Sequence, residues 1–136
     1  MKWTKKTLSE LEYIITGAAI EVHSLLGPGL LESAYHKCME IEMISRGLDV
    51  KSEMTVPFTY KETELVTNLR CDFFVDDIIA LELKAADCLT PIDEAQTLTY
   101  MRLLLSPKGL LFNFNVLNIV REGKKSMVNE LYANLD

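Results

Sequence analysis

Two carboxylates and a lysine lie in strand-like segments at a spacing that could bring them into one site. Asp72 is in the segment 65–75, and Glu82 and Lys84 are two residues apart in the segment 78–85. Residues two apart in a strand point to the same face, so Glu82 and Lys84 share a face. Burying a carboxylate and an amine beside a core is costly unless they pair or contact a metal ion. The pattern therefore predicts either a surface hairpin with an ion pair or a carboxylate site for a divalent cation.

Whether Asp72 and Glu82 meet depends on the loop between their strands. Directly opposed residues of a hairpin point to the same face of the sheet. A two-residue turn at 76–77 puts the two carboxylates on opposite faces. A three-residue loop over 75–77 pairs Asp72 with Ala80, which makes Glu82 a diagonal neighbour at roughly 5–8 Å. One cation could then bridge both carboxylates, so a shared metal ion requires an odd-length loop or a bulge here.

Further polar residues on the predicted helices could join the same site. Gln96 and Tyr100 are four residues apart, so they share one helix face and could hold a phosphate or orient a water molecule. A purely structural interpretation makes Tyr100 a core aromatic and leaves Gln96 in solvent. Glu32 is in the first turn of its helix, where the dipole favours a carboxylate whether or not it binds a metal ion. His23, near the end of the first helix, is expected to meet the helix dipole rather than a metal ion.

Hydrophobic periodicity predicts the elements that would position these residues. The expected helices span 7–26, 30–46, 91–105 and 126–134, and the expected strands span 50–60, 65–75, 78–85, 110–114 and 117–121. Pro57 indicates an edge strand or a bulge. Alternation in 65–75 puts Asp72 on one face and both Cys71 and Phe73 on the other. The order of elements predicts an α/β fold with a mixed central sheet.

Length and composition are those of an ordinary globular chain. The 136 residues fit one domain, and with 49% hydrophobic and 25% charged residues the chain is expected to be neither disordered nor membrane-embedded. The first residues contain no uninterrupted apolar run, so we expect no signal peptide or membrane span. Three cysteines without a CxxC pair argue against a disulfide framework or a zinc site. We therefore expect a single domain over residues 1–136, in the reducing cytoplasm.

The charge balance bears on nucleic-acid binding. With 14 basic and 20 acidic residues the net charge is −6, which makes the chain a poor general binder of phosphate backbones. Carboxylates that bind divalent cations add to the negative count and are neutralised by the metal. Contact with nucleic acid must then come from a local basic patch, although each basic residue alone is more easily explained as a solvated charge. The residues available for the patch are Lys5, Lys6, Arg102, Lys108, Arg121, Lys124 and Lys125.

Taken together, the candidate residues resemble a known family. The segment from Gly27 to Tyr35, GPGLLESAY, resembles the signature of the GxxExxY proteins, which belong by similarity to the PD-(D/E)xK nuclease superfamily. In chain order the candidate residues are Glu32, Asp72, Glu82-x-Lys84 and Gln96-x-x-x-Tyr100. This order is similar to that of the RecB-like branch, whose last motif is QxxxY. The resemblance runs from about residue 23 to residue 113, and the combined order is more specific than any single motif.

The resemblance implies a fold, a cofactor and an activity. The implied fold is a PD-(D/E)xK nuclease-like αβββαβ core, with a mixed central sheet flanked by helices. The implied cofactor is Mg²⁺ or Mn²⁺, held by Asp72, Glu82 and Glu32 with the Leu83 carbonyl as a further ligand. The implied activity is hydrolysis of phosphodiester bonds in DNA, in repair, recombination or defence, by water that the metal activates.

The resemblance also implies roles for the remaining residues. Lys84 would orient the attacking water or stabilise the transition-state charge. Gln96 and Tyr100 would steady the scissile phosphate or the nucleic-acid backbone. Two positions depart from relatives: Asp93 stands where His is frequent, and Asn115 stands where Gly is frequent. Neither is a core motif residue, and both leave room for a changed substrate.

Two other functions compete with the nuclease. A catalytically silent module with the same fold would bind nucleic acid or a protein partner, and the acidic balance and small size favour it. A weaker alternative is a protein that binds iron or another metal without phosphodiester chemistry. A small domain of this type often needs a homodimer to grip a duplex, although the sequence contains no clear interface stripe.

Overall fold

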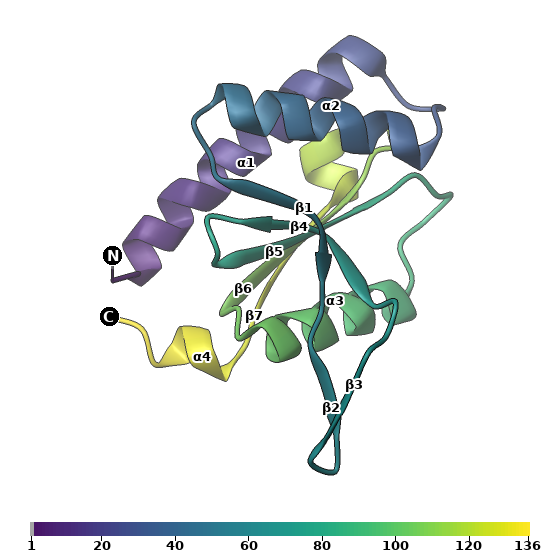
Figure 1. Ribbon diagram of the computed structural model, residues 1–136. Helices are drawn as coiled ribbons and strands as arrows, with labels where there is room; N and C mark the ends of the chain where they lie inside the picture. The colour runs from purple at the N-terminus through teal and green to yellow at the C-terminus, as the bar shows by residue number, and fades with distance from the viewer. Residues whose placement is uncertain (1) are drawn as a thin grey trace.

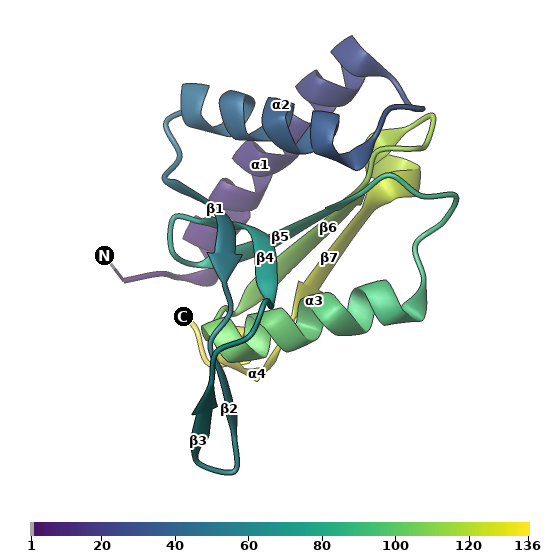
Figure 2. The same cartoon turned by 45° about the vertical axis from the view of Figure 1, so that its right-hand side comes forward.

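A computed structural model describes residues 2–136 and contains a five-stranded sheet between two layers of helices (Figure 1). Helices α1 (Lys5–Leu26) and α2 (Glu32–Ser45) cover one face, and α3 (Pro91–Leu104) covers the other (Figure 2). The expected α/β class, with a mixed sheet flanked by helices, is confirmed. Within residues 2–136, no helix is both long and apolar enough to cross a bilayer.

The sheet carries the predicted αβββαβ core. Its strands, in spatial order, are β1 (Val50–Thr55), β4 (Arg70–Val75), β5 (Ile79–Lys84), β6 (Lys108–Asn113) and β7 (Lys124–Val128). β5 and β6 run parallel because α3 carries the chain back between them, and all other neighbours are antiparallel. β2 (Phe58–Tyr60) and β3 (Thr63–Leu65) form a separate hairpin that projects from the domain (Figures 1 and 2).

Two of the predicted strands are shorter than expected. The segment 50–60 divides before Pro57, because proline has no N–H to donate to a ladder. The segment 65–75 forms central-sheet structure only from Arg70 onward, since its first residues close the hairpin. The hairpin turns at Lys61 and Glu62, both with positive φ, which is the backbone that a two-residue loop requires.

The end of the chain differs from the prediction. The expected strand 117–121 is wrong, because residues Ile119–Gly123 form a short π-helix whose start is capped by the Asn118 side chain. The expected helix 126–134 is wrong in its first half, where β7 pairs with β6. Only Glu130–Ala133 is helical, as α4, and the Asn129 side chain caps its first turn. Pairing with an existing sheet edge therefore outweighs the local helical pattern.

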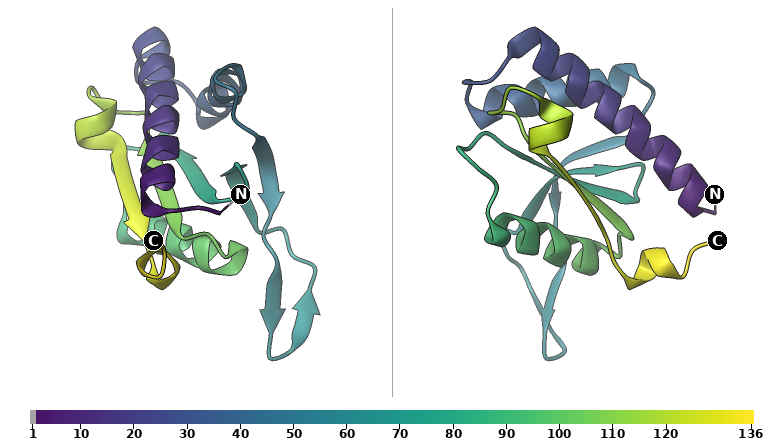
Figure 3. Two further views of the ribbon diagram at one scale, coloured as in Figure 1. Left: turned by 90° about the vertical axis from the view of Figure 1, so that its left-hand side faces the viewer. Right: turned by 180° about the vertical axis from the view of Figure 1, so that it is seen from behind.

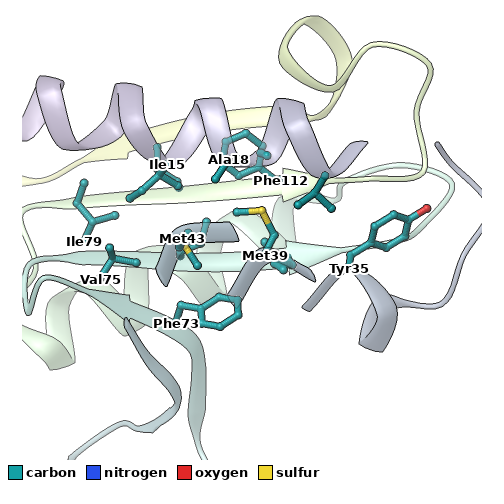
Figure 4. Packing of buried hydrophobic residues seen from close by; sticks show 14 of the residues in the cluster. Ile15, Ala18, Tyr35, Met39, Met43, Phe73, Val75, Ile79 and Phe112 are labelled. Atoms are coloured by element: carbon teal, nitrogen blue, oxygen red, sulfur yellow. The ribbon is translucent and has the colours of Figure 1, made fainter. Parts of the chain in front are cut away.

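The main core lies between the α1–α2 layer and the sheet. α1 crosses the sheet diagonally with α2 packed beside it (Figure 3). Figure 4 shows the buried side chains that meet there, among them Ile15, Ala18, Met39, Met43, Phe73, Val75, Ile79 and Phe112. A smaller cluster on the other face joins Cys71 and Ala80 to Tyr100 and Met101 of α3. The two clusters hold β4 and β5, the strands that carry the candidate carboxylates, from both sides.

Two lysines of the expected basic patch are neutralised inside the protein. The Lys108 and Lys124 ammonium groups bind the two oxygens of the Glu12 carboxylate, at 2.7 Å and 2.8 Å. Burial alone would raise the pKa of Glu12, but the hydrogen bonds and charges of the two lysines outweigh it and lower the pKa. These lysines tie α1 to the β6–β7 edge, so two of the seven candidates for a basic patch are paired with Glu12.

We expect Glu12→Gln to destabilise the fold strongly. The substitution leaves the Lys108 ammonium, whose side chain is only 9% exposed, without a counter-ion. Breaking a buried ion pair on one side costs about 3–5 kcal/mol, and the partial exposure of Lys124 puts this case near the lower end. Urea unfolding measures the loss, with the exposed Glu10→Gln as the control. Equal stability of the two variants would contradict the structural role of this cluster.

Candidate active site and metal centre

The loop between β4 and β5 is odd in length, as a shared metal ion requires. The strand register pairs Val75 with Ile79 and Phe73 with Leu81, so the loop consists of residues 76–78. The loop is one residue later than the expected loop over 75–77, so Asp72 does not pair with Ala80. Continued along the strands, this register sets Asp72 directly opposite Glu82 rather than diagonal to it.

The two carboxylates replace the ladder where β4 and β5 separate. The backbone N–H of Asp72 donates to the Glu82 carboxylate at 2.7 Å, and the N–H of Leu83 donates to the Asp72 carboxylate at 2.8 Å. In an antiparallel pair, the N–H and C=O of one residue point to the same neighbouring strand. The Leu83 carbonyl therefore faces the same gap as the two carboxylates, so the gap brings together three oxygen-bearing groups from two strands.

A reversal of side-chain alternation opens this gap. Cys71 packs on the α3 side of the sheet, whereas Phe73, two residues later, packs on the α1–α2 side. The same reversal occurs on β1, where Val50 packs on the α1–α2 side and Met54 on the α3 side. The predicted alternation, which placed Cys71 and Phe73 on one face, is wrong at Asp72. The irregular backbone at Asp72 turns its carboxylate into the gap.

Burial and charge strongly perturb Glu82. Its side chain is buried, and burial followed by the negative charge of Asp72 raises the pKa of Glu82 to about 8. Tyr100 lies on the α3 side of the same place, and burial followed by the charge of Glu82 raises the pKa of its hydroxyl. Two adjoining carboxylates with little counter-charge favour a bound cation, because a cation relieves both repulsion and desolvation.

Lys84 follows on β5 and reaches toward the start of α3. Its ammonium is 3.9 Å from the Asp93 carboxylate, and its side chain is 28% exposed. Asp93 also closes the capping box of α3, accepting from the Thr90 N–H at 3.0 Å while its own N–H donates to the Thr90 hydroxyl at 3.2 Å. Asp93 therefore has a structural role at the start of α3, and it places a negative charge beside Lys84.

The helix residues that were expected in the site differ in how near they lie to Asp72 and Glu82. Glu32 is in the first turn of α2, where burial followed by the charge of Asp72 raises the pKa of its carboxyl. Gln96 is exposed on α3, and no hydrogen bond within residues 2–136 joins it to Asp72, Glu82 or Glu32. Tyr100 is a buried aromatic of the smaller cluster, as the structural interpretation expected. Glu32 and Asp72 line one hollow on the α2 side, whereas Tyr100 lies near Glu82 on the α3 side.

His23 and Tyr35 shape the chain around the site without entering it. His23 bonds the Val116 carbonyl through Nε2 at 2.7 Å. The Tyr35 hydroxyl donates to the Gly27 carbonyl at 2.6 Å and accepts from the Leu30 N–H at 3.1 Å. The Asn115 side chain accepts from the Gly29 N–H, so it also holds this loop. Together these bonds fix the loop that leads into α2.

We expect Tyr35→Phe to cost about 1 kcal/mol of stability, because one hydroxyl serves two backbone groups of a partly exposed loop. The ring keeps its stacking on Phe114, so the core is not disturbed. Urea unfolding measures the difference against Tyr13→Phe, which changes a tyrosine that is 81% exposed. A loss no greater than that of the control would exclude a role for this hydroxyl in holding the loop.

Sequence reasoning missed two residues beside the site, His36 and Glu53. They line a hollow next to Asp72. His36 could have been found, since it lies one turn after Glu32 on the same helix face. Glu53 carried no signal, because nothing in its type predicts the left-handed backbone that it adopts.

The fold and the opposed carboxylates define a nuclease-like domain. The family model of the PD-(D/E)XK nuclease superfamily matches residues 9–126, so the chain belongs to this superfamily. Its members generally use divalent metal ions. Searches of curated proteins and of solved structures gave no match.

The donor atoms of the gap are of the type that hard divalent cations bind. All the donors are oxygens, which Mg²⁺ and Mn²⁺ prefer, and the buried Glu82 carboxyl gains from a nearby positive charge. Within residues 2–136 no three His, Cys, Asp or Glu side chains already stand in a metal-holding group. Asp72 and Glu82 each use one oxygen on a backbone N–H, which leaves the second oxygen of each carboxylate for an ion.

Proposed function

We propose that the protein is a Mg²⁺- or Mn²⁺-dependent nuclease that hydrolyses phosphodiester bonds in DNA. The observation that carries the proposal is the pair Asp72 and Glu82, set opposite one another across a gap between strands and followed at once by Lys84. Two carboxylates set against each other repel and Glu82 is buried, so a bound cation would relieve both the repulsion and the desolvation.

The side chains divide the work as follows. Asp72, Glu82 and the Leu83 carbonyl would hold the ion, with Glu32 completing the set from α2. When bound, the ion would lower the pKa of a water nucleophile and stabilise charge at the phosphorus. The Lys84 ammonium, partly exposed at the mouth of the gap, would orient that water or stabilise the transition-state charge.

The two candidate residues of α3, Gln96 and Tyr100, would have different roles. The exposed Gln96 could contact the nucleic-acid backbone. Tyr100 lies on the α3 side of the gap, close enough for the charge of Glu82 to act on its hydroxyl. Steadying of the scissile phosphate would therefore fall mainly to Gln96.

We extend the proposal to the GxxExxY proteins and the RecB-like branch. The contacts of Tyr35 support the first, because the motif tyrosine ties the loop that begins at Gly27 and so sets where Glu32 lies. The order from Glu32 to Tyr100 supports the second. The same proposal includes a single domain over residues 1–136 that binds DNA as a homodimer. It places the protein in the cytoplasm, in repair, recombination or defence.

The alternative is a silent module that keeps the fold and binds nucleic acid or a protein. The net charge of −6 favours it, as does the loss of Lys108 and Lys124 from the basic patch to Glu12. It predicts no cleavage with any divalent metal, yet salt-sensitive binding to nucleic acid or a stable protein partner.

The test is cleavage of single- and double-stranded DNA with Mg²⁺, Mn²⁺ or EDTA. We expect the wild type to cleave with metal and both Asp72→Ala and Lys84→Ala to lose cleavage. The matched control is Asp77→Ala, which removes an acidic residue that pairs with Lys51 on the surface. Equal cleavage by wild type and both site variants would assign the activity to a contaminant. No cleavage by any of them would favour the silent module.

A further inference from the structure

A hollow of about 330 Å³ opens beside Asp72, between α2 and β1. We call it the α2 hollow. Its lining consists of Glu32, Ser33, His36, Lys37, Glu53 and Asp72. Asp72 and Glu32 belong to the proposed metal centre, whereas His36 and Glu53 are not among its proposed ligands. The two residues therefore border the place where α2 meets the metal centre.

His36 joins α2 to β1. Its Nε2 lies 3.2 Å from the Ser52 hydroxyl and 3.7 Å from the Glu53 carboxylate. Its ring packs edge-on against Phe73, with the ring centroids 4.2 Å apart, and its side chain is only 16% exposed. His36 is thus held on two sides, by polar contacts with β1 and by packing on β4.

Glu53 adopts a backbone that glutamate rarely takes. Its φ is +53°, in the left-handed region, although it lies within a strand. The register pairs Ser52 with Phe73 and Met54 with Cys71, which leaves Glu53 level with Asp72 but outside the ladder. The strained residue therefore stands at the point where both strands reverse their alternation, and this backbone brings its carboxylate to His36. Residues with such strained backbone conformations are concentrated at functional sites.

The start of α2 needs anchors of this kind. The residue before the helix, Leu31, gives no side-chain cap, so local bonds do not fix the first turn. Tyr35 ties that turn to the loop behind it. His36 ties it to β1 on the other side, and it lies four residues after Glu32, on the same face of the helix. The position of Glu32 relative to Asp72 thus depends on the contacts that His36 makes.

We propose that His36 and Glu53 are positioning residues that hold the first turn of α2 against β1, so that Glu32 stands beside Asp72 as the third carboxylate of the metal centre. This inference rests on the proposed function. It gives the strained backbone of Glu53 a purpose, since a relaxed strand would pair with β4 and carry the carboxylate away from His36.

The experiment measures Mn²⁺ affinity by calorimetry and the melting temperature of the metal-free protein. His36→Leu keeps packing on Phe73 but loses the polar contacts, and His36→Gln keeps a polar group that can reach Ser52. Glu53→Gly removes the carboxylate and relieves the positive φ. The matched control is Glu62→Gly, which relieves a positive φ in the exposed turn of the β2–β3 hairpin, where it projects from the domain (Figure 2). Asp72→Asn and Glu82→Gln give the Mn²⁺ affinity that remains when the metal centre is disabled.

We expect His36→Leu and Glu53→Gly each to weaken Mn²⁺ binding by about tenfold, as loss of a residue that orients a ligand commonly does. His36→Gln should recover most of the affinity, and Glu62→Gly should bind as the wild type does. Metal-free Glu53→Gly should melt no lower than the wild type, which separates lost positioning from lost folding.

Two results would overturn the inference, and they can be told apart. Wild-type affinity in both His36→Leu and Glu53→Gly, with binding still lost in Asp72→Asn, would remove the positioning role and leave the proposed function intact. Mn²⁺ binding that is absent from the wild type, or unchanged in Asp72→Asn and Glu82→Gln, would overturn the proposed function and this inference with it.

Discussion

Replacing Glu82 by glutamine should abolish metal-dependent cleavage and, at the same time, stabilise the metal-free protein at pH 8. The loss of an ionised ligand should reduce cleavage by about three orders of magnitude, since metal catalysis supplies several kcal/mol. The stability gain follows from burial and the charge of Asp72, which raise the pKa of Glu82 to about 8. The glutamine amide still accepts from the Asp72 N–H and adds a donor beside the Asp72 carboxylate.

The pH dependence of stability follows from the direction of this shift. The folded metal-free protein keeps the Glu82 proton to a higher pH than the unfolded chain, whose pKa is near 4.5. Folding therefore binds a proton between about pH 4.5 and 8, and the stability that Glu82 contributes is lost as the pH rises through that window. Each unit of pKa difference corresponds to about 1.4 kcal/mol.

Thermal unfolding in EDTA from pH 5 to pH 9 tests this expectation. The wild type should lose stability across the window more steeply than Glu82→Gln, and Mn²⁺ should restore stability to the wild type but not to Glu82→Gln. Glu64→Gln, on the exposed β3, is the control and should follow the wild type. Parallel pH profiles for the wild type and Glu82→Gln would mean that Glu82 ionises as freely in the folded protein as in the unfolded chain.

Lys84→Ala should separate catalysis from metal binding. We expect cleavage to fall by about 10²–10³-fold, the usual effect of removing one group that stabilises transition-state charge. Mn²⁺ affinity should stay the same or rise, because a positive charge beside the carboxylates is removed. Lys61→Ala, in the turn of the β2–β3 hairpin, provides the control for a general loss of positive charge. Equal cleavage by the two lysine variants would exclude Lys84 from the reaction.

The regular elements around the site could be predicted because their signals are local. The periodicity of α1 and of 91–105, and the apolar β5 and β6, follow directly from the pattern of buried residues. The condition that the loop before β5 be odd in length also came from strand parity alone. Which three residues form this loop could not be predicted, since several turns are possible within 75–78. The pairing of Val75 with Ile79 decides that the loop is 76–78.

The irregular features could not be predicted because tertiary contacts impose them. The reversal at Asp72 and Glu53 depends on two helical layers packing against opposite faces of the same two strands. The ion cluster of Glu12 joins residues almost a hundred positions apart in the chain. β7 formed where a helix was expected because the edge of β6 was available. The candidate ligands could be named from their order, but the gap that brings them together required the structure.

The most direct test of the metal centre is anomalous diffraction from crystals grown with Mn²⁺. The account predicts one anomalous peak in the gap between β4 and β5, within about 2.0–2.6 Å of oxygens from Asp72, Glu82 and the Leu83 carbonyl. Glu32 should have turned toward the same peak. A gap without a peak at saturating Mn²⁺, with Asp72 and Glu82 still bonded to the backbone N–H groups of Leu83 and Asp72, would contradict it.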